Sequence, residues 1–268
     1  MAHFQCSFPS SVLLVPANVT VVLPFPAFDP VLSDASLDEI YQSGQKFKTL
    51  YLLHGAFADA GVLSMFGRLE EYALRHGLAV VMPSVGNSFY ADLQHGPDYF
   101  TYVTEELPRF VQSVFPLSSK REDNFVAGFS MGGYGAFKVA LNKPEKFAAG
   151  ISISGVLDLV AVMQHPIHPV FDVDDYYGGA DKLKGSGSDL FAQLLKLKQS
   201  GATIPELYMA CGLEDNLYDM NVKFRDLAHE NSIPLTFEDG PGAHTSDFLD
   251  QFMYRGLEWL AQNLLPAE

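Results

Sequence analysis

One serine of the chain stands in a setting that could make it a nucleophile. Ser130 lies between two glycines in the run Gly128-Phe129-Ser130-Met131-Gly132. An apolar run at 125–127 precedes this motif, and the residues at 133–141 that follow it have helical character. A G-x-S-x-G motif between a strand and a helix predicts a nucleophile elbow, a tight turn that projects the serine hydroxyl above the sheet edge. The helix N-terminus there stabilises a developing negative charge.

The motif needs partners, because the same letters could also mark a Gly-rich turn whose serine caps the helix. A serine hydroxyl becomes a good nucleophile when a histidine takes its proton and a carboxylate orients that histidine. When the nucleophile sits on such an elbow, the acid and then the histidine follow it along the chain, on loops after later strands. A carboxylate and then a histidine are therefore expected after Ser130, each in a loop that follows a strand.

The acid is expected directly after a strand. Residues 207–211 are apolar and strand-like, and they lead into Gly212-Leu213-Glu214-Asp215-Asn216. Asp215 is the predicted catalytic acid, and Glu214 is its neighbouring competitor. A purely structural role for Asp215, as the N-cap of the helix that follows, is the alternative.

The base is predicted at His244. A strand at 235–238 leads into the Gly/Pro-rich stretch 239–246, which contains His244 and precedes a long amphipathic pattern at 246–265. Of the eight histidines, His244 alone follows Ser130 and Asp215 and lies in a loop after a strand. His229 also lies downstream, but within a helical stretch, where an exposed surface histidine is expected.

An oxyanion hole requires two backbone N–H groups that point at the developing negative charge. One is expected from Met131, the residue after the nucleophile. The other is expected from the loop after the strand 48–53, which ends in His54-Gly55. Ala56 is the predicted donor there and Phe57 is the next candidate, while His54 is interpreted as a structural histidine at the base of the loop.

Short apolar strands alternate with helical segments along the whole chain, which predicts the α/β class. We expect a mostly parallel, twisted sheet with helices on both faces, and a single domain over 1–268, since no Pro/Gly/Ser linker divides the sequence. Strands are predicted near 4–8, 19–23, 48–53, 78–82, 125–127, 150–154, 207–211 and 235–238, and helices over 64–76, 100–114, 133–141 and 246–265.

Residues 157–200 are too many for a simple crossover, and we interpret them as a small excursion over the active site. It contains His165 and His168 and an acidic stretch at 172–175. Prolines interrupt any regular face of these residues and no carboxylate stands at a ligand spacing, so a solvated loop is favoured over a metal site. No metal and no cofactor are expected anywhere in the chain.

The 268 residues carry a formal net charge of −15, which argues against nucleic acid or an anionic membrane as a partner. The N-terminus lacks a basic segment, and its apolar stretch at 12–23 is interrupted by polar residues and proline, so neither a signal peptide nor a spanning helix is predicted. Cys6 and Cys211 lie far apart in strand-like segments. Two buried free thiols are expected, which favours a reducing compartment, the cytoplasm.

Several stretches distributed over nearly the whole chain keep the order and spacing of a known family. They are Leu52-Leu53-His54-Gly55, Gly86-Asn87-Ser88-Phe89-Tyr90, Glu105-Glu106-Leu107-Pro108, Gly128 to Ala136, Tyr177-Gly178-Gly179, Cys211 to Tyr218 and Gly242-Ala243-His244. Together they resemble the esterase D family of α/β-hydrolases. Within that family the sequence is most similar to bacterial tributyrin esterases, which are acetyl-esterase-like.

The resemblance implies an α/β-hydrolase fold and a serine carboxylesterase whose substrate is a small-molecule ester with a short acyl chain. Acetylated or feruloylated sugars and the thioester S-formylglutathione are the alternative substrates, and self-association into a homo-oligomer is also implied. Thr245 replaces the usual aromatic residue after the histidine, and Ala56 replaces a larger residue. The oxyanion loop differs from that of the relatives that hydrolyse S-formylglutathione, which disfavours this substrate. A catalytically silent binding protein on the same fold is the alternative that is not an enzyme.

Overall fold

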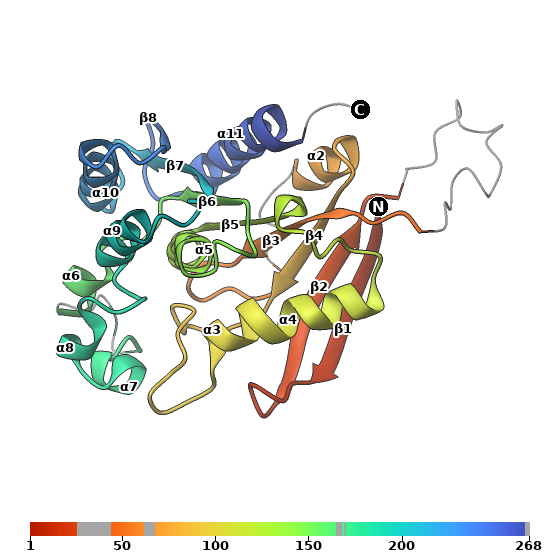
Figure 1. The fold of residues 1–268 in the computed structure, drawn as a ribbon, viewed down its shortest axis with the longest axis horizontal. Helices are drawn as coiled ribbons and strands as arrows, with labels where there is room; N and C mark the ends of the chain where they lie inside the picture. Colours follow the sequence, from red (N-terminus) through yellow and green to blue (C-terminus); the bar gives the residue numbers. More distant parts are fainter. Residues whose placement is uncertain (26–43, 62–67, 165–167, 169, 266–268) are drawn as a thin grey trace.

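A computed structural model of the chain describes residues 1–25, 44–61, 68–164, 168 and 170–265 (Figure 1). Its strands are β1 (Ala2–Pro9), β2 (Pro16–Leu23), β3 (Lys48–Leu53), β4 (Leu78–Pro83), β5 (Asn124–Phe129), β6 (Ala149–Ile153), β7 (Glu206–Gly212) and β8 (Thr236–Gly240). Its helices are α2 (Leu69–Arg75), α3 (Tyr99–Thr101), the π-helix η3 (Tyr102–Glu106), α4 (Leu107–Val114), the 3-10 helix η4 (Arg121–Asp123), α5 (Met131–Asn142), α6 (Leu159–Gln164), α7 (Val173–Tyr177), α8 (Ala180–Leu183), α9 (Leu190–Ser200), α10 (Tyr218–Glu230) and α11 (Ser246–Leu264).

The strands form one 8-stranded sheet in the order β1-β2-β4-β3-β5-β6-β7-β8. Strand β2 pairs antiparallel with both β1 and β4, and every pair from β4 through β8 is parallel. The predicted mostly parallel sheet is therefore confirmed, and the arrangement is the α/β-hydrolase fold. Because the strands from β3 to β8 run in the same direction, the loops after β3, β5, β7 and β8 all leave from one edge of the sheet.

Helices cover both faces of the sheet, as the alternation of side chains along each strand requires. On β3, Tyr51 and Leu53 point to one face, where they join the cluster that α4, α5, α9 and α10 complete. Leu50 and Leu52 point to the other face, where they join residues of α2 and α11. Figure 1 shows the two helices α2 and α11 together on one side of the sheet. Packing between these two apolar layers and the sheet holds the strands in place, and with them the loops that follow the strands.

All the predicted strands are present, and so is each predicted helix in the described part of the chain. The helix expected over 64–76 is described from Leu69 onward, since 62–67 lie outside the described residues. The prediction of one domain stays a prediction, which the continuous sheet supports. No helix of the described residues combines the length and apolar character needed to cross a membrane.

The excursion contains more regular structure than the sequence indicated. The acidic stretch at 172–175 was predicted to be a solvated loop, and this is wrong for its last three residues, which begin the short helix α7. The Asp172 carboxylate accepts hydrogen bonds from the N–H groups of Asp174 and Asp175, so a cap that suits a helix N-terminus explains part of the acidity. His168 is exposed, and His165 lies outside the described residues.

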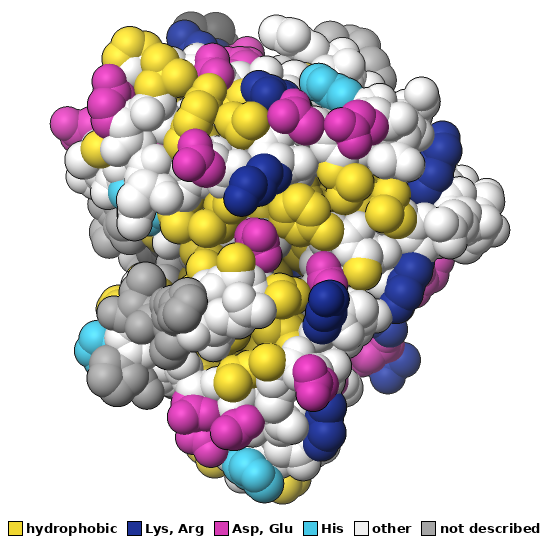
Figure 2. All heavy atoms as spheres, turned by 90° about the vertical axis from the view of Figure 1, so that its left-hand side faces the viewer, with side chains coloured by type: hydrophobic (Ala, Val, Ile, Leu, Met, Phe, Trp, Pro, Cys, Tyr) yellow, Lys and Arg dark blue, Asp and Glu magenta, His cyan; other side chains and the backbone are white. Residues whose placement is uncertain are grey.

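Figure 2 shows the face of the molecule that carries α6 to α10. Hydrophobic side chains form a band across the middle of this face, and acidic side chains lie above and below it.

The excursion is attached to the rest of the fold by hydrogen bonds from α5. The Tyr134 hydroxyl donates to Ser188 O at 2.7 Å, and Asn142 Nδ2 donates to Gly187 O at 2.8 Å. These bonds hold it beside the helix that begins after Ser130.

Candidate active site

Ser130 lies on a strained turn between β5 and α5, as the elbow predicts. Its backbone angles are φ 55° and ψ −122°, a conformation that costs a non-glycine residue free energy and that clusters at functional sites. The two flanking glycines are required sterically: a Cβ on Gly128 would lie 2.2 Å from Gly132 O, and one on Gly132 would lie 2.1 Å from Leu53 O. Only glycine therefore allows β5, α5 and β3 to approach so closely around the serine.

Asp215 and His244 meet although they come from different loops. Asp215 follows β7, His244 follows β8, and His244 Nδ1 lies 2.9 Å from Asp215 Oδ2. The other carboxylate oxygen, Oδ1, accepts the N–H of Leu217 at 2.9 Å. The Asp215 side chain is fully buried and the His244 side chain is 33% exposed, so the carboxylate is shielded from solvent while the imidazole ring is accessible. With Nδ1–H donated to the carboxylate, the His244 ring presents a free lone pair at Nε2.

The charge of Asp215 is maintained by its hydrogen bonds. Burial on its own would raise the pKa of Asp215, but the hydrogen bonds from His244 and from Leu217 N–H, together with the proximity of the Ser154 hydroxyl, outweigh it, and the pKa lies below its ordinary value. The carboxylate is therefore ionised at neutral pH, as is required of a group that orients a histidine and stabilises its charged form.

Glu214, the competing acid, has a different position. Its carboxylate accepts the backbone N–H of Gly242, two residues before His244, and its own N–H donates to Gly242 O at 3.0 Å. A Cβ on Gly212 would lie 2.1 Å from that same carbonyl. Glu214 thus fastens the backbone of the histidine loop, while Asp215 contacts the ring itself. The N-cap of α10 is Leu217, so the alternative interpretation of Asp215 as that N-cap is wrong. Asp215 lies two residues before the N-cap and accepts the Leu217 N–H there.

Ser130 and His244, both of which the structure describes, are not hydrogen-bonded to each other. The backbone of Ser130 is held by its N–H, which donates to Ile153 O at 2.9 Å, and by its carbonyl, which accepts from Tyr134 at 3.1 Å and from Val156 at 3.3 Å. In ligand-free enzymes the bond between nucleophile and base is often long, and it tightens when substrate binds. The structure thus brings the acid and the base together and fixes the turn of Ser130 at the same sheet edge.

The two candidates for the second oxyanion donor are distinguished by their hydrogen bonds. Phe57 N–H donates to Asn87 Oδ1 at 2.7 Å, so it is not available to a substrate. Within the described residues neither Ala56 N–H nor Met131 N–H donates a hydrogen bond. Both of the N–H groups predicted for the oxyanion hole are therefore free, and Phe57 is disfavoured.

The stretch Gly86 to Tyr90, noted in the sequence without a role, supports the oxyanion loop. Asn87 fixes Phe57 N–H, and the Tyr90 hydroxyl donates to His54 O at 2.8 Å. His54 is fully buried: its Nε2 accepts Val85 N–H at 3.1 Å, and its Nδ1 lies 2.7 Å from Gly55 O. Burial lowers the pKa of His54, so the ring is neutral, and the predicted structural role fits these contacts.

Sequence reasoning missed two residues near the site. Asn87 carries no motif of its own, and only its place in the stretch 86–90 could have pointed to it. Ser154, at the end of β6, has φ 47° and is fully buried, and its hydroxyl contributes to the lowered pKa of Asp215. The positive φ of a residue other than glycine is not visible in a sequence.

The rim of the site is apolar on the side of the oxyanion loop. Phe57 is 68% exposed, and its ring lies 5.6 Å from the His168 ring and 6.0 Å from the Phe171 ring. The excursion thus reaches the active-site edge, as predicted. In the described part of the chain no three His, Cys, Asp or Glu side chains gather in a way that could hold a metal ion.

Two further histidines lie on the surface. His229 is exposed on α10, as expected from the sequence, and His95 is exposed in the loop before α3. Both cysteines are free, but only Cys211 is buried: Cys6, on the edge strand β1, is half-buried, so the prediction of two buried thiols is wrong for Cys6. An edge strand has one open side, which explains the exposure.

Comparisons with known proteins agree with this geometry. The model of the Esterase family, described as "putative esterase", matches residues 36–190. An acetyl esterase of Caldicellulosiruptor saccharolyticus is 33% identical over 269 residues, which cover 98% of this chain and 99% of that protein. The substrate-bound fluorophosphonate-binding serine hydrolase F (FphF) of Staphylococcus aureus superposes with a TM-score of 0.85 at 35% identity, covering 97% of this chain and 98% of that one.

A second solved structure, the S-formylglutathione hydrolase FrmB of Staphylococcus aureus, has a TM-score of 0.82 and 35% identity over the same shares of the two chains. The resemblance noted in the sequence is thereby confirmed. From the extent of these matches, the chain belongs to the Esterase family, and it is a serine hydrolase with the α/β-hydrolase fold and esterase activity.

Proposed function

We propose that the chain is a serine carboxylesterase for short-chain acyl esters, with Ser130 as nucleophile, His244 as base and Asp215 as the acid that orients it. The observation that carries this proposal is the 2.9 Å contact between His244 and the buried Asp215, at the sheet edge where the strained turn presents Ser130. The similarity to an acetyl esterase over 98% of the chain supports a short acyl group.

The reaction follows from these positions. Ser130 Oγ attacks the ester carbonyl carbon while His244 Nε2 takes the hydroxyl proton, and the N–H groups of Met131 and Ala56 hold the oxyanion. The tetrahedral intermediate collapses, the bond to the leaving alkoxide breaks, and His244 returns the proton to it as the alcohol departs. Water then attacks the acyl-enzyme by the same steps, which releases the carboxylic acid and restores Ser130.

The test is the Ser130→Ala variant, assayed with p-nitrophenyl acetate and with a fluorophosphonate probe. We expect kcat to fall by about 10⁴- to 10⁶-fold, because the residues of a triad act as one unit. Labelling should be lost while the circular dichroism spectrum is unchanged. Ser113→Ala, which alters a serine on the exposed side of α4, is the matched control and should retain activity and labelling. Activity in Ser130→Ala close to that of the wild type would reject the proposed nucleophile.

A thioesterase is the second candidate, favoured by the 35% identity to a protein named S-formylglutathione hydrolase. The proposed triad serves an ester and a thioester equally, so the pocket decides between them. Comparing kcat/KM for S-formylglutathione with kcat/KM for p-nitrophenyl acetate, acetylated sugars and feruloyl esters separates these substrates. A folded wild-type protein that takes no fluorophosphonate label would instead indicate the silent binding protein.

The proposal extends to location and partners. We place the enzyme in the cytoplasm, where the two free cysteines would stay reduced. A small-molecule ester is its expected partner, and with a net charge of −15 we expect no association with nucleic acid or anionic membranes. The homo-oligomer that the family resemblance implies is to be measured by light scattering.

A further inference from the structure

A cavity of about 230 Å³ lies between α4 and the loop that joins α5 to β6. Asn124 lines it at the start of β5, whereas Ser130 follows the other end of that strand. At about 3.3 Å per residue the six-residue strand separates the cavity from the catalytic edge by roughly 17 Å. The lining residues are Tyr51, Thr104, Glu105, Pro108, Arg109, Gln112, Ser119, Asn124, Glu145, Lys146 and Phe147.

Two buried polar atoms that line this cavity lack a hydrogen bond of normal geometry among the described residues. Tyr51 is 1% exposed and its hydroxyl has no such bond, although the Gln112 side chain, which also lines the cavity, is near enough to interact with it. Asn124 is 4% exposed and its Oδ1 accepts no hydrogen bond. Buried polar atoms are nearly always hydrogen-bonded, because removing them from water without a partner costs about 1–3 kcal/mol. Two such atoms lining one cavity indicate that something polar occupies it.

The free chemistry of each group follows from the bonds it already makes. Asn124 Nδ2 donates to Ser118 O at 3.0 Å and to Lys120 O at 2.6 Å, so both amide hydrogens are used and Oδ1 remains as an acceptor. Burial raises the pKa of Tyr51, which keeps the phenol protonated and able both to donate and to accept. A molecule that fits this site therefore donates at least one hydrogen bond and can accept another.

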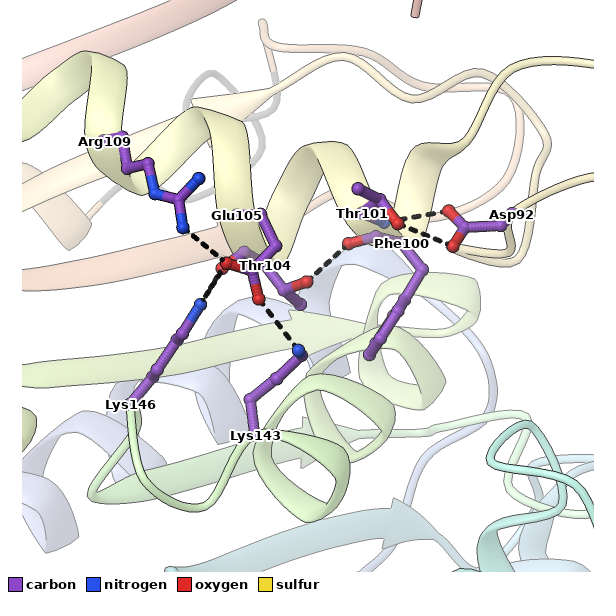
Figure 3. Close-up of polar contacts among 8 residues, drawn as sticks. All are labelled: Asp92, Phe100, Thr101, Thr104, Glu105, Arg109, Lys143 and Lys146. Carbon is purple, nitrogen blue, oxygen red and sulfur yellow. Dashed lines mark hydrogen bonds and ion pairs between the residues drawn. The ribbon is translucent and has the colours of Figure 1, made fainter. Parts of the chain in front are cut away.

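The charges around the cavity favour a neutral molecule. Glu105 is the centre of a closed ion cluster, in which Arg109, Lys143 and Lys146 all lie within 3.2 Å of its carboxylate (Figure 3). Two acidic residues, Glu105 and Glu145, and two basic residues, Arg109 and Lys146, line the cavity, so their formal charges sum to zero. Phe147 forms an apolar wall, with its ring 5.6 Å from the Tyr51 ring at an interplanar angle of 83°.

We propose that this cavity is a binding site for a small neutral polyhydroxy compound, of the size of glycerol or a single sugar ring. Its hydroxyl groups would donate to Asn124 Oδ1 and exchange a hydrogen bond with Tyr51, and its C–H face would pack on Phe147. A volume below the usual 300–1,000 Å³ of ligand pockets restricts the occupant to a molecule of this size. The site is independent of the esterase reaction, since it shares no residue with the proposed triad.

Ligand-observed NMR with glycerol and D-xylose tests the site, comparing wild type with Tyr51→Phe. We expect saturable binding to the wild type and an affinity about tenfold lower in the variant, the loss of one hydrogen bond. The unfolding temperature should change little, since the Tyr51 hydroxyl makes no hydrogen bond of normal geometry within the described residues. Tyr208→Phe is the matched control, because its hydroxyl is also buried without such a bond but does not line the cavity.

Binding in Ser130→Ala should equal that of the wild type, so a failure of this proposal is distinguishable from a failure of the proposed esterase mechanism. No saturable response to either compound would mean that water alone fills the cavity and would overturn the proposal. Equal affinity in the wild type and in Tyr51→Phe, or equal weakening in Tyr208→Phe, would overturn it as well.

Discussion

Replacing Asp215 with asparagine preserves the shape of the acid loop while changing where the His244 proton lies. In the wild type, Oδ2 accepts Nδ1–H of His244 at 2.9 Å and Oδ1 accepts Leu217 N–H at 2.9 Å. The asparagine oxygen will keep the Leu217 bond, because an amide nitrogen there would face another donor. Its NH₂ group then faces His244 Nδ1, which must accept. The histidine proton moves to Nε2, where it blocks the transfer from Ser130.

Two effects set the size of the loss. The buried carboxylate attracts the imidazolium that forms during catalysis, and at about 4 Å between charge centres and an effective dielectric constant of about 20 this amounts to roughly 4 kcal/mol. Screening reduces this figure, because a third of the His244 side chain is exposed. A remaining 3 kcal/mol or so corresponds to a factor of about 10² in rate. The tautomer change adds to it, and we expect kcat to fall by about 10³- to 10⁴-fold.

Steady-state turnover of p-nitrophenyl acetate across pH measures this loss, and thermal unfolding shows whether the variant is folded. Glu214→Gln is the matched control: it removes a neighbouring charge but leaves the His244 contact intact, so we expect less than about a tenfold change, since Glu214 contacts only the backbone of the loop. If Asp215→Asn is folded and within tenfold of the wild type, or if Glu214→Gln suffers the larger loss, then Asp215 is not the residue that orients the base.

Two further predictions concern stability and pH, each measured by urea unfolding. Lys143 and Lys146 lower the pKa of Glu105 to about 2 in the folded state, so its contribution is complete above its ordinary pKa of 4.5 and is lost as pH falls toward 2. Glu105→Gln should therefore lower the unfolding free energy at pH 7 by about 1–3 kcal/mol, with a difference that vanishes near pH 2; a difference independent of pH would contradict this. Burial lowers the pKa of Lys138 to about 7, so the unfolded chain binds more protons between pH 7 and 10.5 and stability rises with pH there. Lys138→Met should stabilise most at or below pH 7, and an advantage that grows above pH 7 would refute this.

The turn that carries the proposed nucleophile could be located from the sequence because its requirements are steric. Gly128 and Gly132 are needed for close backbone contacts, and a glycine is visible in a sequence. The same steric reasoning could not decide whether Asp215 or Glu214 is the residue that contacts the histidine. Both follow β7, and the direction each points depends on how the loop after β7 pairs with the loop after β8, a long-range contact. Likewise the acidic stretch at 172–175 looked like a solvated loop, because the cap that Asp172 provides depends on the helix that follows it.

The proposed triad is positioned by the ends of four neighbouring strands rather than by its own side-chain contacts. Three backbone hydrogen bonds continue the pairing of the sheet into the loops: Ser130 N–H to Ile153 O at 2.9 Å, Ser154 N–H to Ala210 O at 2.7 Å, and Leu213 N–H to Gly240 O at 2.9 Å. Together they link the ends of β5, β6, β7 and β8 in order. The backbone positions of the nucleophile, acid and base loops are thus set before any substrate arrives. The His244 ring is bonded at Nδ1 to Asp215, and 33% of its side chain is exposed. In the proposed mechanism this side chain is therefore the group that adjusts to form the hydrogen bond with Ser130 when an ester binds.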